Sequence, residues 1–435
     1  MTRIRVLAIA YACNPTRGSE DAVGWGWINA IAQQHDVTVI TADYNKPDIE
    51  AIGALQGGTE DSLQFRYVKN RPWHYRPWGV WAKIEASPAK PIMSLAYSNW
   101  LDHALLAAEN EMASGSYDLV HLITYVGWRF CGKFYRLNLP FVWGPIGGLM
   151  NTPWRLMPAL GLKGALYHTG RNIVNSLQIA LLPGPRKALS KAGGAVIAAT
   201  PETQRALAAH FESASRVICE VGLPDVGLVD PPLRAPNEDL RICWSGPHIP
   251  RKALHLLLNA AALLPKESKF SIQILGDGPS SKNWRALAQR LRVADRCTWH
   301  GRLPRSAALE VMKTSHAFVI TSLNELTSTV AVEAISVGLP VVTLNHCGMA
   351  DLVTDTCGIK VDVRSVDQII HDLSLAILRL MNDEALRRSL SQGALLRSLD
   401  YSWSKKLASL NEVYSVALGS HNRTLTEAAA FWRPV

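Results

Sequence analysis

Short apolar segments alternate with helical patterns along the whole chain, and they do so in two successive series. The first series covers 4–12, 37–43, 63–68, 119–125, 141–146 and 195–200, and the second covers 240–246, 270–276, 297–301, 317–322, 340–344 and 358–363. Most segments are continuous apolar runs, which is typical of parallel strands covered on both faces. Strands that alternate with helices in this way predict doubly wound α/β sheets.

Two series of strands predict two Rossmann-like domains, as does a length of 435 residues. The break is expected in 219–241, which is rich in Pro, Gly and Asp. We therefore expect an N-terminal domain over 1–222, a C-terminal domain over 223–414, and a helix or tail over 415–435 that returns to the first domain. Because open parallel sheets bind ligands beyond the carboxyl ends of their strands, the site should lie in the cleft between the domains.

Two segments of the first half interrupt this rhythm, 66–85 and 151–192. Both combine cations with aromatic or apolar residues at amphipathic spacing. Such a composition is typical of a membrane interface, whereas the alternative is a lid or insertion that packs on its own domain. The sequence leaves both interpretations open.

The formal net charge of +9 allows three kinds of anionic partner: nucleic acid, an anionic membrane face or a phosphorylated small molecule. No nucleic-acid recognition module can be identified, so we expect no nucleic-acid partner. The seven cysteines are scattered without a CxxC pair, which favours a reducing, cytoplasmic compartment. We interpret the apolar run before Cys13 as a first buried strand rather than a signal peptide, and no apolar stretch reaches the roughly 18 residues that span a membrane.

The stretch 324–342, NELTSTVAVEAISVGLPVV, places a carboxylate in an apolar helix. A helix is predicted from one of the hydroxyl residues 327–329 to about Val337, with Gly338 ending it. It has no polar face, so Glu333 should be buried and needs a partner. The local sequence supplies no cation, so that partner is either a distant Arg or Lys or a ligand rich in hydroxyls.

Glu325 lies at the carboxyl end of a predicted strand, just before this helix. The helix start between the two acids offers free N–H groups and the positive end of the helix dipole, which suit a phosphate. A carboxylate, an anion site and a second carboxylate match the order sugar, pyrophosphate and ribose in a nucleotide sugar. The alternative is that both glutamates belong to structural salt bridges.

A second basic element follows the strand 240–246. Gly246 ends that strand, and Arg251 and Lys252 lie where the next helix is expected to begin. Cations at this end of a helix are unfavourable unless an anion lies between them and the helix dipole. We interpret that anion as a phosphate, held by Arg as a forked donor and by Lys as a point charge.

With these elements, the chain resembles retaining glycosyltransferases of the GT-B fold, family 4, over nearly its whole length. The two glutamates separated by seven residues are the most specific mark of the resemblance. RKAL after a Gly loop, LGDGP at 275–279, GRLPR at 301–305 and CGMADLV at 347–353 follow in the expected order. In the first half, GSEDAVGWGW, DLVHLITYVGWR and FVWGPIGG are similar to a subgroup found in bacterial polysaccharide assembly.

The resemblance implies that the first domain binds the acceptor and that the second domain binds the nucleotide sugar, which would be UDP- or GDP-linked. Glu333 would bind the ribose hydroxyls and Glu325 the hydroxyls of the donor sugar. Arg251 and Lys252 would hold the pyrophosphate together with the amides of Leu326, Thr327, Ser328 and Thr329.

The resemblance also implies that His121 lies at the active site near the sugar. Arg302 and Leu303 would flank the base, and the loop of Gly18, Ser19 and Glu20 would close over the phosphates. His121 has a simpler alternative as a packed core histidine. The chain departs from the family at Pro247 and His248, where an Arg commonly follows the glycine, and at Gly18, which stands where two glycines are common.

No Asp-x-Asp element ends a strand, so no catalytic metal and no other cofactor is expected. The leading hypothesis is a retaining hexosyltransferase that moves a sugar to a saccharide, in particular a lipid-linked one at the cytoplasmic membrane face, in exopolysaccharide or lipopolysaccharide assembly. The alternatives are a sugar-nucleotide epimerase or phosphorylase of the same fold, and a non-catalytic scaffold that binds nucleotide sugar or membrane. An NAD-dependent oxidoreductase is disfavoured, since the Gly fingerprint is incomplete.

Overall fold

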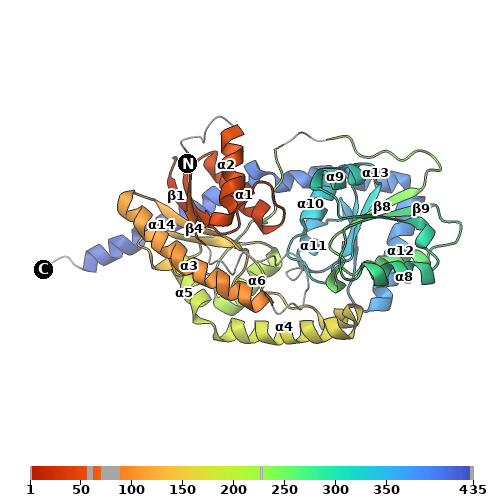
Figure 1. The fold of residues 1–435 in the computed structure, drawn as a ribbon, viewed down its shortest axis with the longest axis horizontal. Coiled ribbons are helices and arrows are strands. Elements are labelled where there is room, and N and C mark those ends of the chain that lie inside the picture. The colour runs from red at the N-terminus through yellow and green to blue at the C-terminus, as the bar shows by residue number, and fades with distance from the viewer. Residues whose placement is uncertain (1, 56–61, 70–88, 226, 228, 432–435) are drawn as a thin grey trace.

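The structure is a computed structural model that describes residues 2–55, 62–69, 89–225, 227 and 229–431. The basic and aromatic segment predicted at 66–85 therefore lies outside the described residues from position 70 onward. Two lobes, each built around a parallel sheet, lie side by side in Figure 1.

The N-terminal domain is built on a seven-stranded parallel sheet with the order β3-β2-β1-β4-β5-β6-β7. Alternate residues of β1 face opposite ways, as strand geometry requires: Leu7 and Ile9 enter one hydrophobic cluster, and Val6 and Ala8 enter another. Both faces of this sheet are therefore buried, which explains the continuous apolar runs. The strands are β1 (Arg5–Ala10), β2 (Asp36–Ala42), β3 (Leu63–Val68), β4 (Leu119–Thr124), β5 (Phe141–Ile146), β6 (Val196–Ala198) and β7 (Arg216–Val217).

Helices cover the two faces of this sheet. The cluster that contains Val6 and Ala8 includes α1, and the opposite cluster includes α3 and α5. The helices of the domain are α1 (Glu20–Ala32), α2 (Lys46–Leu55), α3 (Ala89–Ser114), α4 (Gly161–Leu181), α5 (Pro183–Ala192) and α6 (Pro201–Phe211), and 3-10 turns lie at η1 (Asp43–Asn45), η4 (Phe134–Arg136) and η5 (Trp154–Leu160).

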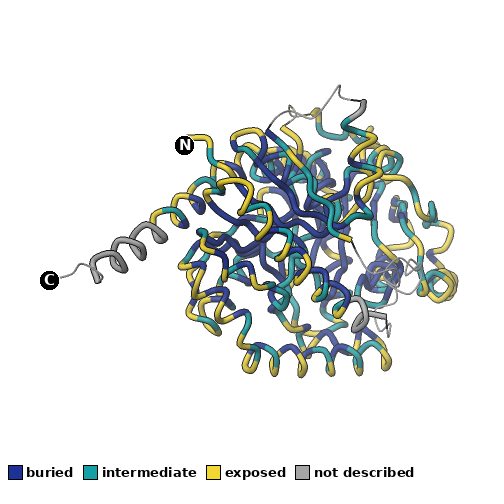
Figure 2. The backbone as a smooth tube through the Cα atoms, turned by 60° about the vertical axis from the view of Figure 1, so that its left-hand side comes forward, coloured by how far each residue is buried: buried dark blue, intermediate teal, exposed yellow. Residues whose placement is uncertain are grey.

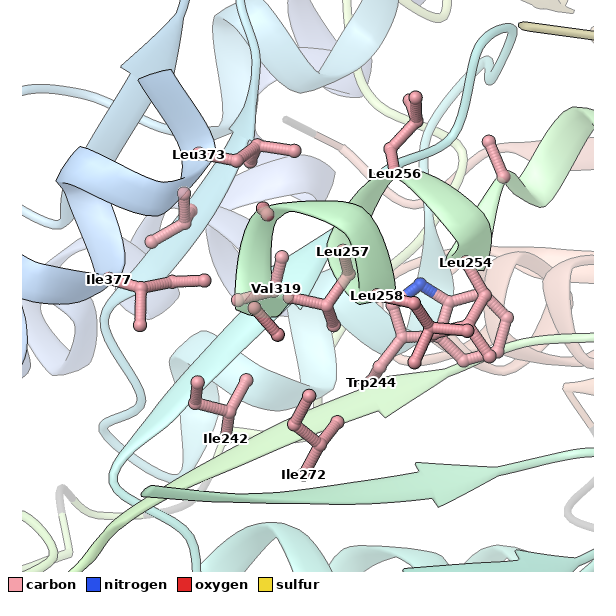
Figure 3. Close-up of a cluster of buried hydrophobic side chains, with 14 of the residues drawn as sticks. Ile242, Trp244, Leu254, Leu256, Leu257, Leu258, Ile272, Val319, Leu373 and Ile377 are labelled. Atoms are coloured by element: carbon pink, nitrogen blue, oxygen red, sulfur yellow. The ribbon is translucent and has the colours of Figure 1, made fainter. Parts of the chain in front are cut away.

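The C-terminal domain repeats the design with a six-stranded parallel sheet of order β10-β9-β8-β11-β12-β13. Ile242 and Trp244 of β8 face a core formed with α7 and α12, in which Leu254 and Leu258 lie beside the indole (Figure 3). The strands are β8 (Leu240–Ser245), β9 (Phe270–Leu275), β10 (Cys297–Gly301), β11 (Ala317–Ile320), β12 (Val341–Leu344) and β13 (Gly358–Val361). Both predicted series of strands and the fold class of two doubly wound parallel sheets are confirmed.

The helices of this domain again cover both faces of its sheet. Phe318 and Ile320 of β11 pack with α10 on the face opposite to Trp244. The helices are α7 (Leu254–Ala262), α8 (Ser281–Arg290), α9 (Arg305–Lys313), α10 (Thr329–Ser336), α11 (Cys347–Leu352), α12 (Val366–Asn382) and α13 (Glu384–Ser398), and 3-10 turns lie at η6 (Pro250–Lys252), η7 (Ala294–Arg296) and η8 (Leu399–Tyr401).

The chain crosses back to the first domain earlier than the sequence predicted. Helix α14 (Trp403–Phe431) begins 12 residues before position 415, and Leu407, Leu410 and Tyr414 pack in the N-terminal core. The crossing point is marked by a bridge between Leu223 and Ser402. Residues 403–414 belong with this helix, because their apolar side chains complete the core under α1.

The segment 151–192 does not belong to the N-terminal domain alone, as its assignment to 1–222 implied. Leu156, Met157 and Leu160 of η5 are buried in the core of the C-terminal domain with Trp244 and Leu373. Helix α4 follows and runs from this lobe back to the other along the lower edge of Figure 1. Figure 2 shows buried residues concentrated on the central strands, with exposed residues on the outer helices. Within the described residues, no helix is long and apolar enough to cross a bilayer.

Candidate active site

The loop 321–328 joins the carboxyl end of β11 to helix α10 in the C-terminal domain. Ser328 is the N-cap residue of α10, and its side chain makes no capping hydrogen bond. Backbone N–H groups at the start of a helix have no partner within the helix, so this end offers donors and a positive dipole to an anion. The predicted helix and its end before Gly338 are confirmed.

Glu325 is the centre of a charge cluster in this loop. Its Oε2 accepts hydrogen bonds from Lys252 Nζ at 2.6 Å and from Arg251 Nη1 at 3.0 Å. The Arg251 Nη1 also donates to the Asn324 carbonyl at 3.1 Å, and the Leu323 N–H donates to the Arg251 carbonyl at 2.8 Å. The turn η6 and the loop 321–328 are therefore held together by charge and by backbone contacts.

Burial shapes the acid–base chemistry of this cluster. Burial alone raises the pKa of Glu325, but the neighbouring Lys252 and Arg251 outweigh it, so the pKa lies below its ordinary value. Burial lowers the pKa of Lys252, and the charge of Glu325 opposes that change. Two cations therefore share the one carboxylate of Glu325 beside the start of α10.

This geometry corrects one step of the sequence argument. Arg251 and Lys252 lie in η6, ahead of α7, which begins at Leu254. The anion that balances them is the carboxylate of Glu325, 73 and 74 residues further along the chain. Their position before a helix is therefore no indication of phosphate by itself. The position of these two cations beside the N-terminal end of α10 is the feature that suits an anionic ligand.

Glu333 is buried on α10 and meets a different kind of cation. Its Oε1 accepts a hydrogen bond from Arg305 Nε at 2.5 Å, while the Arg305 side chain is 66% exposed. Of the two partners that the sequence allowed, a distant arginine is therefore the one present in the structure. Arg305 starts α9 and is the last residue of the GRLPR element, in which Arg302 and Leu303 were expected to flank a base.

Arg302 is exposed, and Leu303 packs on the core cluster beside α10. Gly246 lies against Lys252: a Cβ at this glycine would be 3.5 Å from the Lys252 Cδ. The structure thus brings the loop after β8 and the loop after β10 to the same edge of the sheet as Glu325 and Glu333. This edge is formed by the carboxyl ends of the strands, where doubly wound sheets bind ligands.

The N-terminal domain approaches the same loop from the other side. A Cβ at Gly147 of the N-terminal domain would lie 2.3 Å from the Leu326 side chain. Within the C-terminal domain, a Cβ at Gly348 would lie 1.5 Å from the Leu326 carbonyl. Asn324 Nδ2 donates to Thr152 Oγ1 at 2.9 Å across the two domains. The loop that carries Glu325 is therefore enclosed by both lobes, and two glycines permit the close approach.

Two carboxyl groups at the domain junction have raised pKa values. Burial is the main cause for both Glu20, whose pKa rises to about 7, and Glu220, and the charge of Glu220 adds to the effect on Glu20. Glu20 Oε2 accepts a hydrogen bond from the Val126 N–H at 3.3 Å. The hydroxyl of Thr327 hydrogen-bonds to Glu220, so the first loop and the start of α10 meet at this junction.

Gly18 and Ser19 are exposed at the start of α1, where Ser19 is the N-cap residue with a φ of 61°. A Cβ at Gly18 would have nothing within 4 Å. The first loop is thus open at Gly18 and Ser19 and anchored at Glu20. This arrangement leaves room for a ligand beside the two residues, but their expected closure over phosphates stays a prediction.

His121 does not lie at the cleft surface. It is fully buried on β4; its Nδ1 hydrogen-bonds to the Tyr414 hydroxyl at 2.9 Å and its Nε2 to the Gly144 carbonyl at 2.8 Å. Burial lowers its pKa to about 4, so the ring is neutral at pH 7. Because both nitrogens are occupied by the protein, the geometry is that of a packed core histidine, and it gives no support to the expected role beside the sugar.

Among the described residues, no group of three or more His, Cys, Asp or Glu side chains is arranged to hold a metal ion. The cations described at this edge include Arg251, Lys252 and Arg305, each paired with a glutamate, and the exposed Arg302.

The sequence did not identify Asn324 and Thr152 as parts of this site. Arg305 was visible as the second cation of GRLPR, and only its pairing with Glu333 was hidden. Asn324 stands directly before Glu325, where a short polar residue at a strand end is a usable signal. Thr152 carried no signal, since its role depends on the contact between the two domains.

Comparisons with known proteins bear on the C-terminal domain most directly. Residues 229–397 match the family of glycosyl transferases group 1. The D-inositol 3-phosphate glycosyltransferase of Streptomyces avermitilis is 25% identical over 352 residues, which cover 74% of this chain and 70% of that protein.

Solved structures extend the similarity to the whole fold. Sucrose-phosphate synthase from Thermosynechococcus elongatus has a TM-score of 0.66 at 17% identity, covering 96% of this chain and 100% of the other. The Anabaena protein HepE, solved in complex with UDP-glucose, has a TM-score of 0.57 at 16% identity, covering 95% and 100%. At these identities the similarity establishes the two-domain fold.

Proposed function

The chain is a glycosyltransferase, and from that premise we propose that it moves a sugar from a nucleotide-sugar donor to a saccharide acceptor with retention of configuration. The observation that carries the proposal is the cluster of Lys252, Arg251 and Glu325 at the start of α10. It combines two cations with the N-terminal end of a helix, at the edge where the two domains meet.

The pyrophosphate of the donor is the group that this cluster suits. Arg251 supplies a forked donor and Lys252 supplies a point charge, and we assign the amides of 326–329 to the same anion. Charge develops on the leaving nucleoside diphosphate as the sugar departs, and fixed donors in a protein interior stabilise such charge strongly. Glu325 keeps both cations in position, and its remaining carboxylate oxygen is the one that we assign to the hydroxyls of the sugar.

Glu333 is the residue that we assign to the ribose hydroxyls. Its partner Arg305 is held by one ion pair and is largely exposed, so a ligand can replace that contact while Arg305 turns to solvent or to the nucleotide. We assign Arg302 and Leu303, on the same loop, to the base. We assign Gly18 and Ser19 to the phosphates, on the side of the N-terminal domain.

The donor is proposed to be UDP- or GDP-linked, and the acceptor a saccharide, in particular a lipid-linked one at the cytoplasmic membrane face. The UDP-glucose bound to HepE supports a UDP-linked donor. The resemblance of the first half to enzymes of polysaccharide assembly supports a lipid-linked saccharide acceptor, as does the segment 151–192. These assignments place the enzyme in exopolysaccharide or lipopolysaccharide assembly, within family 4 of the retaining glycosyltransferases.

Transfer is further proposed to need no metal ion, because Arg251, Lys252 and the helix N–H groups carry the charges that a metal would otherwise supply. Treatment with EDTA should leave turnover unchanged. A loss of turnover that added Mg²⁺ or Mn²⁺ restores would contradict this part of the proposal.

A thermal-shift screen with UDP, GDP and their sugars tests the donor, because a ligand that binds only the folded protein raises its melting temperature. Incubation of the stabilising donor with acceptor saccharides should then release nucleoside diphosphate and form a glycoside with the anomeric configuration of the donor. Isomerised donor without release would indicate an epimerase, and sugar phosphate formed from inorganic phosphate would indicate a phosphorylase. Binding without turnover for any donor and acceptor would indicate a scaffold.

A further inference from the structure

Helix α4 is amphipathic in the reverse of the usual sense, with polar residues inside. His168, Asn172 and Asn175 are buried on its inner face. His168 Nδ1 hydrogen-bonds to Thr152 Oγ1 at 2.9 Å, and Asn172 Nδ2 donates to the Thr152 carbonyl at 2.8 Å. Asn175 Nδ2 donates to the Leu149 carbonyl at 2.9 Å. The inner face is thus fixed to the segment 149–152 by hydrogen bonds, since buried polar groups need partners.

The outer face of α4 is apolar and exposed. Leu162 is 89% exposed, Leu166 75% and Leu181 74%, and these residues share one stripe with Ile173 and Leu177. Of the sixteen large hydrophobic residues that are exposed in the described parts of the chain, seven lie between Trp154 and Leu181. Single exposed leucines are ordinary, but a continuous stripe of them along one helix marks an interaction surface.

The segment of the chain that contains this stripe is rich in Lys and Arg, of which Lys133 is paired with Asp102 of α3. Residues 119–201 contain nine Lys and Arg and no Asp or Glu. The formal charge of this segment alone therefore equals the formal net charge of the whole chain, +9. Arg155 and Lys163 are exposed at the start of the stripe, and Arg186, Lys187 and Lys191 are exposed beyond its end. An apolar stripe with cations at both ends matches a lipid interface, which has apolar acyl chains beneath anionic head groups.

We propose that the outer face of α4 docks on an anionic lipid bilayer, with the helix lying in the plane of the interface. Its 21 residues give a rod about 32 Å long, and the leucines enter the boundary between head groups and acyl chains. Arg155, Lys163 and the cations of α5 contact the lipid phosphates. The absence of acidic residues favours this occupant over a second copy of the chain, whose matching surface would carry the same positive charge.

The docked helix is connected to the cleft through a short series of contacts. Thr152, which binds His168 and Asn172 on one side, accepts a hydrogen bond from Asn324 on the other, and Asn324 stands next to Glu325. A bilayer under α4 would therefore hold the rim of the proposed donor site at a fixed orientation to the membrane. The inference deepens the proposed function by naming the surface that meets a lipid-linked acceptor, but docking itself does not depend on the transfer chemistry.

Sedimentation of the full chain with vesicles, without donor or acceptor, tests the proposal. The chain should bind vesicles of phosphatidylcholine with phosphatidylglycerol more strongly than vesicles of phosphatidylcholine alone. The double variant Leu166→Gln/Leu177→Gln should bind the anionic vesicles on the order of tenfold more weakly. The matched control Leu375→Gln/Leu396→Gln changes two leucines that are 49% and 60% exposed on the C-terminal domain, and it should bind as the wild type does.

The melting temperatures of both variants should equal that of the wild type, since all four side chains are exposed, and transfer to a soluble acceptor should be unchanged. Equal vesicle binding by the wild type and the α4 variant would overturn the proposal. So would a dimer in lipid-free solution that the α4 changes dissociate, because the stripe would then be covered by a second copy. If the wild type bound anionic vesicles but transferred no sugar, the result would count against the proposed chemistry alone.

Discussion

Glu325 and Glu333 lie eight positions apart and are both largely buried, but their counter-charges differ in kind. Glu325 meets two cations, and the side chain of one of them, Lys252, is only 7% exposed. Glu333 meets one cation, Arg305, whose side chain is 66% exposed. The first pair is enclosed by the protein, whereas the second can open toward solvent.

Because of this difference, the ion pairs of Glu325 are fixed by the protein, whereas the carboxylate of Glu333 is available to a ligand. Releasing Lys252 from Glu325 would leave a buried ammonium group without its carboxylate, which is costly, so the cluster is expected to keep its geometry in every state of the enzyme. Arg305 regains its hydration when it leaves Glu333, so the cost of opening this pair falls on the buried carboxylate alone and is removed when a ligand donates to it. We infer that Glu325 organises the phosphate site and that Glu333 is the carboxylate most ready to take a new partner.

The largest effect is expected from Glu325→Gln, which keeps the shape and removes the charge. Two cations then face each other without their carboxylate, so the free energy of unfolding should fall by about 3 kcal/mol. Turnover should fall on the order of a hundredfold or more, because the pyrophosphate donors lose their alignment. Denaturant unfolding and steady-state kinetics measure the two effects. Turnover within twofold of the wild type would remove Glu325 from the site.

Glu333→Gln is expected to affect ligand binding more than stability. Arg305 would turn to solvent, so the free energy of unfolding should change by less than about 1 kcal/mol. A lost hydrogen bond from ribose to a charged acceptor should weaken UDP binding on the order of tenfold. Calorimetric titration with UDP gives the Kd. A large loss of stability with an unchanged Kd would show that Glu333 is as fixed as Glu325, and the contrast between them would fail.

Arg305→Ala should produce a smaller change than either glutamate variant. The arginine is mostly solvated, so the KM for the donor is expected to rise by only about threefold, although the buried Glu333 loses its cation. Lys313→Ala is the matched control, since Lys313 lies at the other end of α9 and pairs with exposed Glu310. Kinetics at varied donor concentration distinguish the two. An effect of Arg305→Ala as large as that of Glu325→Gln would contradict the weak pairing.

The smallest effect is a pH dependence confined to acid solution. The pKa of Glu325 is lowered by folding, so its stabilising contribution is present above its ordinary pKa of 4.5 and is lost as the pH falls toward the lowered value. The stability difference between wild type and Glu325→Gln should therefore be constant near neutral pH and should shrink below 4.5. Urea unfolding across this range measures it. A difference that persists unchanged in acid would mean that Glu325 is not held ionised by its cations.

Local features of the sequence were sufficient to predict the architecture and the backbone of the site. The apolar runs gave both sheets, because a strand covered on both faces must be apolar throughout. The N-terminal hydroxyls of α10, its apolar faces and Gly338 are all neighbours in sequence, so the helix around Glu333 was predicted to within about one residue.

Contacts between distant residues account for what the sequence did not reveal. The pairing of Glu333 with Arg305 and of Glu325 with Lys252 depends on which loops meet at the sheet edge, and the sequence shows only that cations are available. His121 is similar: its strand was predicted, but Tyr414, which occupies its Nδ1, comes from a helix almost three hundred residues later. The segment 151–192 was recognised as basic and amphipathic, but not as one that buries η5 in the opposite domain.

The account depends most on the claim that the cluster of Glu325, Arg251 and Lys252 binds a nucleoside diphosphate. Calorimetric titration of UDP or GDP, whichever stabilises the wild type, into Lys252→Ala tests it directly, since Arg251 remains to balance Glu325 and the protein should stay folded. We predict a Kd at least about tenfold weaker than that of the wild type. A Kd equal to that of the wild type, in a variant with an unchanged melting temperature, would contradict the claim.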